Sequence, residues 1–570
     1  MRCRGSFRAQ EEDSMKLFSG SLGSGITKGL VITVIVVCAA IAAQAQVYTP
    51  LYNYGSTASD PISPATFSAI AQGRDGRLYS TTGGGGTNNW GAAYAITTSG
   101  SLSKLYDFVA YPAPSGPASG LTLGTDGFFY GSTTTGGAHR LGTVFKLSDI
   151  GVFSDLWDFG NKVDDQGSPE APLVLGADGN LYGTNDGGYN GQYGSVFKIT
   201  PKGALTTIHV FKATDGTTPY GMILGLDGNF YGVTRAGGAH NLGVVFKMTK
   251  AGKVTVLWSF AGYPGDGSQP VGGLVQGNDG VIYGTTYAGG SLNQGTMFKI
   301  SSTGSGYLVL HNFDYTKTVN DGLQPLGDLA LGTDGNVYGT TWKGGKQNVG
   351  VLFRMTPSGQ YSILYSFCSV SGCKDGSYPQ TGMIQHTNGK FYGATESGGQ
   401  TVNGGEFYSL DMGLGPFVDL VAVWGKVGST IEVLGQGFTG TSGVKLGGTT
   451  ANFTVVSDTY LTAKVPAGSS GFVTVTTPGG TLTSSRKFFV TPEITSFSPA
   501  SGPVGTHVVI TGKGLIQATK VTFGSKSASF VVNSDTQVTA TVPAGAVTNK
   551  ISITTPGGKA SSKIKFTVTP

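Results

Sequence analysis

A Gly-Gly pair recurs along the chain, and the residue one or two positions before it changes in chemical type from one copy to the next. This position holds carboxylates, a guanidinium, aromatic rings and a hydroxyl: Thr134, Asp186, Arg235, Tyr287, Trp342 and Glu396. Further aromatic, imidazole and amide side chains lie nearby: Trp90, His139, Tyr189, His240, Asn241, Asn293 and Asn348. Aromatic rings stack on sugar rings, while the polar groups form hydrogen bonds with hydroxyls. The pattern predicts a rim that binds a polar, ring-bearing ligand such as a glycan, with ordinary loop variability as the alternative.

Catalysis has weaker support in the sequence. Asp186 and Glu396 could pair as acid and base, but nothing in the sequence fixes their separation near the distances that glycosidases use. No nucleophile-elbow, zinc-protease, phosphate-loop or EF-hand pattern occurs. The repeated Asp-Gly pairs each supply a single carboxylate, which fits turn chemistry better than Ca²⁺. We therefore predict no catalytic residue, no metal and no cofactor.

These positions belong to a repeat. A tyrosine follows an Asp-Gly or Asn-Gly pair at spacings of 51, 52, 49, 52, 55 and 54 residues: Tyr79, Tyr130, Tyr182, Tyr231, Tyr283, Tyr338 and Tyr392. In one unit, four short β-like runs span Leu156–Phe159, Leu173–Gly176, Leu181–Asn185 and Val196–Ile199. Four strands repeated about every 50 residues are typical of β-propeller blades.

The first run of the repeat is displaced to the N-terminus. Leu51–Tyr54 matches the Leu156–Phe159 run but precedes the first complete unit, and the last unit lacks its own copy. A strand that crosses this gap leaves no open sheet edge. We therefore predict a seven-bladed β-propeller over residues 46–414, with a β-solenoid as the alternative.

The repeat resembles a known family. The matching residues are Asp334–Thr341 (DGNVYGTT), Gly344-Gly345 and Gly350–Arg354 (GVLFR), and the Cys368–Gly376 run looks like part of the same pattern. They are similar to the GloVer (Gloeo/Verruco) tandem repeat of secreted bacterial proteins, over roughly residues 47–412. The resemblance implies an architecture and secretion, and no established activity.

Two further units follow the repeat, and they match each other at an offset of 77 residues. Val427–Ser429 corresponds to Val504–Thr506, and Val465–Gly468 to Val542–Gly545. Their alternating patterns predict two small antiparallel sandwiches, over 415–491 and 492–570. Both resemble the IPT/TIG immunoglobulin-like domain, a spacer or interaction module in secreted proteins. The first copy lacks the proline-bearing opening of the second, so its first strand is expected to differ.

The N-terminal 45 residues have the pattern of a secretory signal. Leu30–Ala43 is a 14-residue apolar run preceded by Lys28, and Ala43-Gln44-Ala45 fits a signal-peptidase site. Met15 is the better start, because Glu11–Asp13 is unfavourable in a leader. An uncleaved anchor is the alternative, and Val37 argues against a lipoprotein site at Cys38. No second apolar segment follows, so no membrane span is predicted in the mature chain.

Composition narrows the class of protein. Gly and Pro make up 119 of 570 residues (95 and 24), charged residues 12% and aromatics 11%. Such a chain is neither disordered nor helical. A net charge of +5 without basic runs argues against nucleic-acid binding. In an oxidising compartment, Cys368 and Cys373 are expected to form a local disulfide, while a redox pair or a zinc site is disfavoured.

The sequence thus predicts a secreted or cell-surface all-β protein. Our first functional interpretation is non-catalytic binding of an extracellular polysaccharide or a surface protein through the propeller loops. A polysaccharide lyase or hydrolase is the second, and a purely structural surface protein is the third. The nine predicted rim residues are Trp90, His139, Asp186, Tyr189, Arg235, His240, Tyr287, Trp342 and Glu396.

Overall fold

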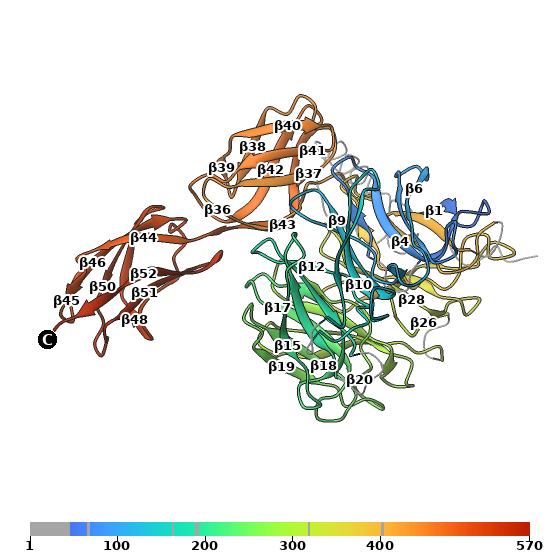
Figure 1. Ribbon diagram of the computed structural model, residues 1–570, viewed down its shortest axis with the longest axis horizontal. Coiled ribbons are helices and arrows are strands. Elements are labelled where there is room, and N and C mark those ends of the chain that lie inside the picture. Colours follow the sequence, from blue (N-terminus) through green and yellow to red (C-terminus); the bar gives the residue numbers. More distant parts are fainter. Residues whose placement is uncertain (1–45, 65–68, 162–164, 188–192, 317–319, 401–403) are drawn as a thin grey trace, which may run out of the picture. The chain divides into compact units, whose positions relative to one another are not determined.

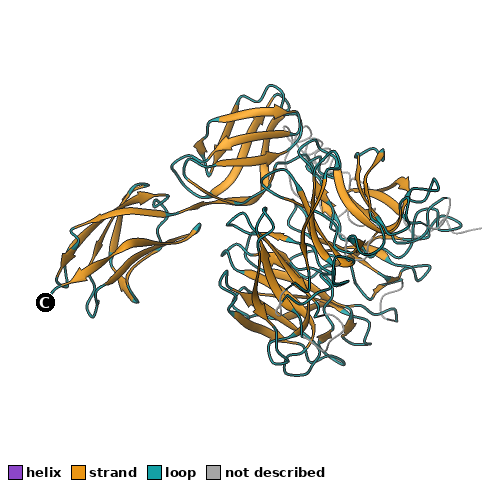
Figure 2. Cartoon of the chain, in the orientation of Figure 1, coloured by secondary structure: helices purple, strands orange, loops and turns teal. Residues whose placement is uncertain are grey.

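A computed structural model describes residues 46–64, 69–161, 165–187, 193–316, 320–400 and 404–570. The predicted signal segment, residues 1–45, lies outside the described residues. The described residues form β-strands joined by turns and loops, and none of them forms a helix (Figure 2). By contacts between Cα atoms, Gln46–Pro570 is one compact unit.

Between residues 47 and 411 the described strands form seven antiparallel sheets of four or five strands (Figure 1). Sheet 1 contains β2 (Pro61–Pro64), β3 (Ala71–Gln72), β4 (Leu78–Gly85), β5 (Ala92–Ile96) and β6 (Leu102–Asp107). Sheet 2 contains β7 (Ser115–Pro117), β8 (Thr122–Leu123), β9 (Phe129–Thr135), β10 (Thr143–Leu147) and β11 (Phe153–Asp158). Sheet 3 contains β12 (Val174–Leu175), β13 (Leu181–Asn185), β14 (Ser195–Ile199) and β15 (Leu205–Val210). Sheet 4 contains β16 (Thr217–Leu224), β17 (Phe230–Ala236), β18 (Val244–Met248) and β19 (Val254–Ser259).

The remaining sheets of this region follow the same order. Sheet 5 contains β21 (Val275–Gln276), β22 (Ile282–Thr286), β24 (Thr296–Ile300) and β25 (Leu308–Asn312), beside the small ladder of β20 (Gly267–Ser268) and β23 (Ala288–Gly289). Sheet 6 contains β27 (Ala330–Leu331), β28 (Val337–Thr341), β30 (Val351–Met355) and β31 (Tyr361–Ser366), beside the ladder of β26 (Gly322–Leu323) and β29 (Lys343–Gly344). Sheet 7 contains β32 (Ile384–Gln385), β33 (Phe391–Ala394), β34 (Glu406–Asp411) and the N-terminal β1 (Val47–Asn53). β1 pairs antiparallel with β34, so the two ends of the repeat region share one sheet.

The repeated tyrosine explains why each sheet packs on the next. Its ring packs on an apolar side chain of the following sheet, which for Tyr79 is Phe129, with ring centroids 3.9 Å apart. In five repeats its hydroxyl donates to the aspartate of its own hairpin turn, as Tyr79 does to Asp75 at 2.8 Å, whereas Tyr392 accepts from Asn388. Buried clusters join each sheet to its successor, and one cluster joins Tyr392 of sheet 7 to Leu78 of sheet 1. The packing therefore closes on itself.

Residues 419–491 form two sheets around one buried core. One sheet has the order β35 (Asp419–Leu420), β37 (Thr430–Leu434), β41 (Tyr460–Lys464) and β40 (Phe453–Ser457). The other has the order β36 (Trp424–Lys426), β43 (Gly480–Thr491), β42 (Gly471–Thr477), β38 (Gly443–Leu446) and β39 (Thr449–Thr450).

Residues 493–568 repeat this arrangement strand for strand. The first sheet has the order β44 (Glu493–Ser498), β46 (His507–Lys513), β50 (Gln537–Thr541) and β49 (Phe530–Ser534). The second has the order β45 (Ser501–Gly502), β52 (Gly558–Val568), β51 (Asn549–Thr555), β47 (Lys520–Phe523) and β48 (Lys526–Ala528). Asp419 pairs with Leu434 as Ser496 pairs with Thr511, which is the same register at the offset of 77. The first strand of the earlier copy therefore keeps its register and is only shorter.

Candidate functional site

Two loops of each repeat meet at the end of the second strand. One contains the Gly-Gly pair, and the other contains the motif Asp-Gly-x-x-Pro or a variant of it. In sheet 1 they form the β2–β4 ladder, in which Ile62 pairs with Gly84. In sheets 5 and 6 they form the small ladders β20–β23 and β26–β29. We call the surface made by these paired loops the loop face.

The motif proline joins neighbouring sheets. In every repeat it packs against a glycine of the preceding sheet, and we call this contact the proline–glycine seam: Gly91/Pro117, Gly142/Pro169, Gly194/Pro219, Gly243/Pro270, Gly295/Pro325, Gly350/Pro379 and Gly405/Pro64. At Gly350, with φ of +105°, a Cβ atom would lie 2.3 Å from the Thr341 carbonyl and 2.6 Å from Cδ of Pro379. Only glycine fits this position.

The motif aspartate is a second structural contact. Its carboxylate accepts from an aromatic N–H or O–H of the preceding outer strand and from a loop N–H. Trp258 Nε1 lies 3.1 Å from Asp266, and Tyr365 Oη lies 2.5 Å from Asp375. Asp321, which has 0% exposure, accepts from His311 Nε2 and from the N–H of Asp314, both at 3.0 Å. This explains why the strand position carries Trp, Tyr or His but never Phe. The aspartate of the Asp-Gly-x-x-Pro loop therefore has a structural role.

The predicted rim residues lie on the loop face where they are described. Asp186, Tyr287, Trp342 and Glu396 each donate a backbone N–H to the carbonyl of the residue before the motif proline. Asp186, Tyr287, Trp342 and Glu396 are half-buried, while Trp90, His139, Arg235 and His240 are exposed. Tyr189 lies outside the described residues. The eight described residues are distributed around the loop face and do not form one cluster.

The amides that we grouped with the rim have a turn role. Asn241, Asn293 and Asn348 have φ of 57–58°, and their side-chain oxygens accept from the first glycine N–H of the Gly-Gly pair at 2.8–3.0 Å. His139 lies 3.2 Å from the Asn161 amide oxygen. These three asparagines therefore hold the loop and offer little to a ligand.

An electrostatic cluster lies on the loop face of sheets 3 and 4. Burial raises the pKa of Glu170, the neighbouring Asp186 raises it further, and Arg235 opposes both effects. Tyr220 is buried, and its pKa is raised by burial, by Glu170 and by Asp328, while Arg235 lowers it. The structure thus couples Asp186 to Glu170 and Arg235, whereas we had considered it as a partner of Glu396.

An aromatic cluster lies on the loop face of sheets 6 and 7. The rings of Trp342 and Tyr378 are 6.1 Å apart and inclined by 48°, and the Lys343 ammonium lies 4.3 Å from the indole centroid. Gln380 donates to the Glu396 carboxylate, whose pKa is raised by burial. The indole N–H of Trp342 is buried and has no acceptor among the described residues. This cluster combines an aromatic platform with polar groups, as a sugar site requires.

Tyr220, Glu170, Tyr378 and Gln380 were missed by the sequence analysis. Three of them, Glu170, Tyr220 and Gln380, directly follow the motif proline, at a position that holds Val271 and Leu326 in other repeats. That variation was a readable signal, because it matches the variation before the Gly-Gly pair. Tyr378 precedes its proline at φ of 56°, a conformation that equivalent residues of other repeats share, so the strain is not specific to this site.

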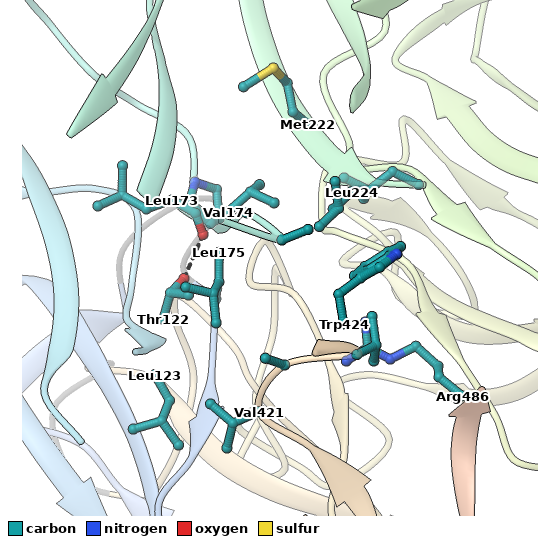
Figure 3. Close-up of a pocket in the computed structure, with 17 residues that line it drawn as sticks. Thr122, Leu123, Leu173, Val174, Leu175, Met222, Leu224, Val421, Trp424 and Arg486 are labelled. Carbon is teal, nitrogen blue, oxygen red and sulfur yellow. Dashed lines mark hydrogen bonds between the residues drawn. The ribbon is translucent and has the colours of Figure 1, made fainter. Parts of the chain in front are cut away.

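Three cavities lie along strands β8, β12, β16, β21, β27 and β32, which we call the inner strands. One of about 180 Å³ contains Asp328, whose pKa is raised to about 6 by burial and whose Oδ1 accepts from the Gly273 N–H at 2.6 Å. The other two enclose about 340 and about 270 Å³, and residues 423–424 and Arg486 border both. Figure 3 shows the first of these, with leucines of sheets 2 to 4 around the same space as Trp424.

Other sequence expectations have clear outcomes. Cys368 and Cys373 form the predicted disulfide. Lys146 and Lys299 donate to carbonyls of the next repeat, Pro201 and Pro357, at 3.3 Å, so these two cations lie against the protein. Within the described ranges no group of three or more His, Cys, Asp or Glu side chains is placed to hold a metal ion. In that part of the chain, no helix has the length and apolar character needed to cross a membrane.

Comparisons with solved structures give weak similarities to enzymes and binding proteins, β-propeller-like ones among them. A streptogramin B lyase is 17% identical, with 65% of this chain and 99% of that chain covered and a TM-score of 0.46. An oligogalacturonate lyase from Vibrio parahaemolyticus is 12% identical, with coverage of 64% and 97% and a TM-score of 0.40. A surface glycan-binding protein from Prevotella bryantii is 19% identical, with coverage of 25% and 38% and a TM-score of 0.20. No curated protein matches the chain.

Sequence profiles identify the family. The profile of the Gloeobacter/Verrucomicrobia repeat matches residues 41–246 and 218–459, and that of the IPT/TIG domain matches residues 492–568. Residues 419–491 share the sheet order of the second unit but lie outside the IPT/TIG match. The chain therefore belongs to the Gloeobacter/Verrucomicrobia repeat family and ends in an IPT/TIG domain.

Proposed function

We propose that this protein is a secreted or cell-surface glycan-binding protein without catalytic activity. In this proposal residues 46–414 form a seven-bladed β-propeller closed by β1, and residues 415–491 and 492–570 form two immunoglobulin-like domains. The continuous packing from sheet 1 to sheet 7 and back supports the propeller, and the equal strand order of the two C-terminal units supports the pair of domains. The disulfide is compatible with an extracellular location.

The observation that carries the binding function is the aromatic cluster on the loop face. Trp342 and Tyr378 offer two inclined rings, and Glu396 and Gln380 offer polar groups on the same face. The indole of Trp342 is half-buried, so part of its ring remains accessible for stacking on a sugar. Tyr287 occupies the equivalent position in sheet 5 and would extend the surface along a longer chain.

Binding to a panel of immobilised polysaccharides tests the proposal. We expect the full chain to be retained by at least one polysaccharide without releasing new sugar ends, and the double variant Trp342→Ala/Tyr287→Ala to lose retention. Each lost aromatic stack is worth about 1–3 kcal/mol of binding free energy, so the two substitutions together should weaken binding on the order of 100-fold. Phe472→Ala is the matched control, because Phe472 is 37% exposed on β42 of the first C-terminal unit and does not belong to the loop face. Unchanged retention by the double variant contradicts the proposal.

The electrostatic cluster favours a second candidate, a polysaccharide-active lyase or hydrolase. Arg235 would neutralise a uronate, while Tyr220 and Glu170 have the proton-carrying groups that such reactions need. Release of unsaturated or reducing sugar ends, lost in Arg235→Gln and Glu170→Gln, would favour this candidate over pure binding. Neither retention nor release would leave a purely structural surface protein.

A further inference from the structure

We propose that the cavity beneath the first C-terminal unit binds a small amphipathic anion, with an apolar body and one carboxylate. The site is distinct from the loop face, because its walls are the inner strands and the segment that enters the first sandwich. The proposal does not depend on the glycan-binding function.

Most of the side chains that line the cavity are apolar, and Thr122 adds a hydroxyl that donates to the Leu173 carbonyl. Sheets 2, 3 and 4 contribute Leu123, Val174, Leu175, Met222 and Leu224, and the segment before β36 contributes Val421. These side chains surround about 340 Å³, within the range of about 300–1,000 Å³ that small-molecule sites occupy. The adjoining cavity of about 270 Å³ shares Ile223 and Leu224 with it, which gives a longer ligand room to extend.

The polar features of the cavity come from two residues of the first sandwich (Figure 3). Trp424 stacks on Phe489 with one face, at 5.2 Å between ring centroids. Trp424 also lines the cavity. No hydrogen bond joins its indole N–H to a described residue. An apolar body can therefore lie along the indole, and an acceptor can bind its N–H.

Arg486 supplies the charge. Its guanidinium has only two contacts to described groups, the Leu420 carbonyl at 3.5 Å and Asp419 Oδ1 at 3.8 Å, both at the limit of a direct interaction. A guanidinium has five N–H donors and prefers a carboxylate that accepts two of them. A cation with unused donors at the edge of an apolar cavity selects an apolar acid over an apolar alcohol of the same length.

Direct contacts between the first C-terminal unit and the sheets hold the two walls together. Arg74 of sheet 1 forms an ion pair with Glu432 of β37, and Leu434 and Tyr460 share a buried cluster with Tyr79. Asn278 donates to the Ser485 carbonyl at 2.9 Å, next to Arg486. The wall that carries Arg486 is thus fixed against the inner strands, so the site is formed before a ligand arrives.

The test compares octanoate with 1-octanol on the full chain, by isothermal titration calorimetry and by tryptophan fluorescence. We expect octanoate to bind at least about tenfold more tightly than octanol, because only the acid gains charge-assisted hydrogen bonds. Arg486→Gln should remove this preference while the affinity for octanol stays within about twofold. Lys487→Gln is the matched control, since it removes a neighbouring charge whose ammonium lies over Phe472 instead.

A second variant locates the site. Ala422 lines the cavity, so Ala422→Phe should fill it and abolish binding of both probes while the melting temperature stays at or above that of the unchanged chain. The proposal is overturned if octanoate does not bind, if octanol binds equally well, or if Arg486→Gln and Ala422→Phe leave octanoate binding unchanged.

Discussion

The seams between the sheets and the loop face are built from the same loops, but they differ in whether their polar groups have partners within the protein. At the seams, each buried aspartate has several donors and each glycine touches the next proline, as Asp321 and Gly350 illustrate. On the loop face, the Trp342 ring is half-buried and Arg235 is exposed. The seam groups are satisfied within the protein, so they stabilise it. The loop-face groups are left with unused capacity, as a binding surface requires.

The largest effect is expected at the seam glycine. Gly350→Ala should destabilise the chain by about 4 kcal/mol, because it combines an unfavourable positive φ with overpacking against Thr341 and Pro379. Urea unfolding followed by tryptophan fluorescence measures the change. Gly335→Ala is the control, since Gly335 has φ of +79° but no atom within 4 Å of a new Cβ, and it should cost only about 1–2 kcal/mol. Equal costs for the two variants would remove the seam from the comparison.

The next effect is expected at the seam aspartate. Asp321→Ala should cost about 3 kcal/mol, because it leaves the His311 ring and the Asp314 N–H without their acceptor in a buried position. Sheet 2 has Ala113 at the equivalent position, so one seam already exists without this contact. On the loop face, Arg235→Gln should change the unfolding free energy by less than about 0.5 kcal/mol. A larger cost at Arg235 than at Asp321 would reverse the assignment of the two regions.

The third prediction concerns the ladder of sheet 7 in which β1 pairs with β34. Glu406 has 0% exposure, and burial raises its pKa to about 8, with Asp375 adding to the shift and the backbone N–H groups of Leu51 and Tyr52 opposing it. In the unfolded chain the pKa is about 4.3. The folded state therefore holds the proton more tightly, so this contribution to stability is complete below about pH 4.3 and is lost as the pH rises to about 8.

Glu406→Gln should remove that pH dependence. Because the amide stays neutral, the variant should be more stable than the unchanged chain at pH 9 and close to it at pH 4. The full shift corresponds to about 5 kcal/mol, and relaxation and water entry around the carboxylate reduce the expected difference to about 2 kcal/mol. Urea unfolding at both pH values measures the difference, and Glu396→Gln on the loop face serves as the matched carboxylate control. A variant that is less stable than the unchanged chain at pH 9 would show that the Glu406 carboxylate is paired in the folded state.

Much of the fold was predictable because the chain contains its own comparison. The tyrosine after Asp-Gly or Asn-Gly recurs because its ring packs on the next sheet, and in five repeats its hydroxyl also donates to the turn aspartate. The displaced Leu51–Tyr54 run agrees with the β1–β34 ladder. The candidate site was predictable only in part. The position before the Gly-Gly pair indicated Trp342 and Glu396 as candidate binding residues. Nothing local in the sequence distinguished them from Asn348, whose side chain stabilises its own turn.

The sequence by itself determined the periodic frame, the local disulfide and the shared plan of the two C-terminal units, because these depend on turn chemistry and strand patterns repeated along the chain. Only the tertiary structure decided which variable residues meet. Tyr378 reaches Trp342, Glu170 couples to Arg235, and Arg486 borders a cavity of sheets 2 to 4. Each of these contacts joins residues of different repeats or different units, and such distances are set by how sheets pack rather than by the order of residues within one repeat.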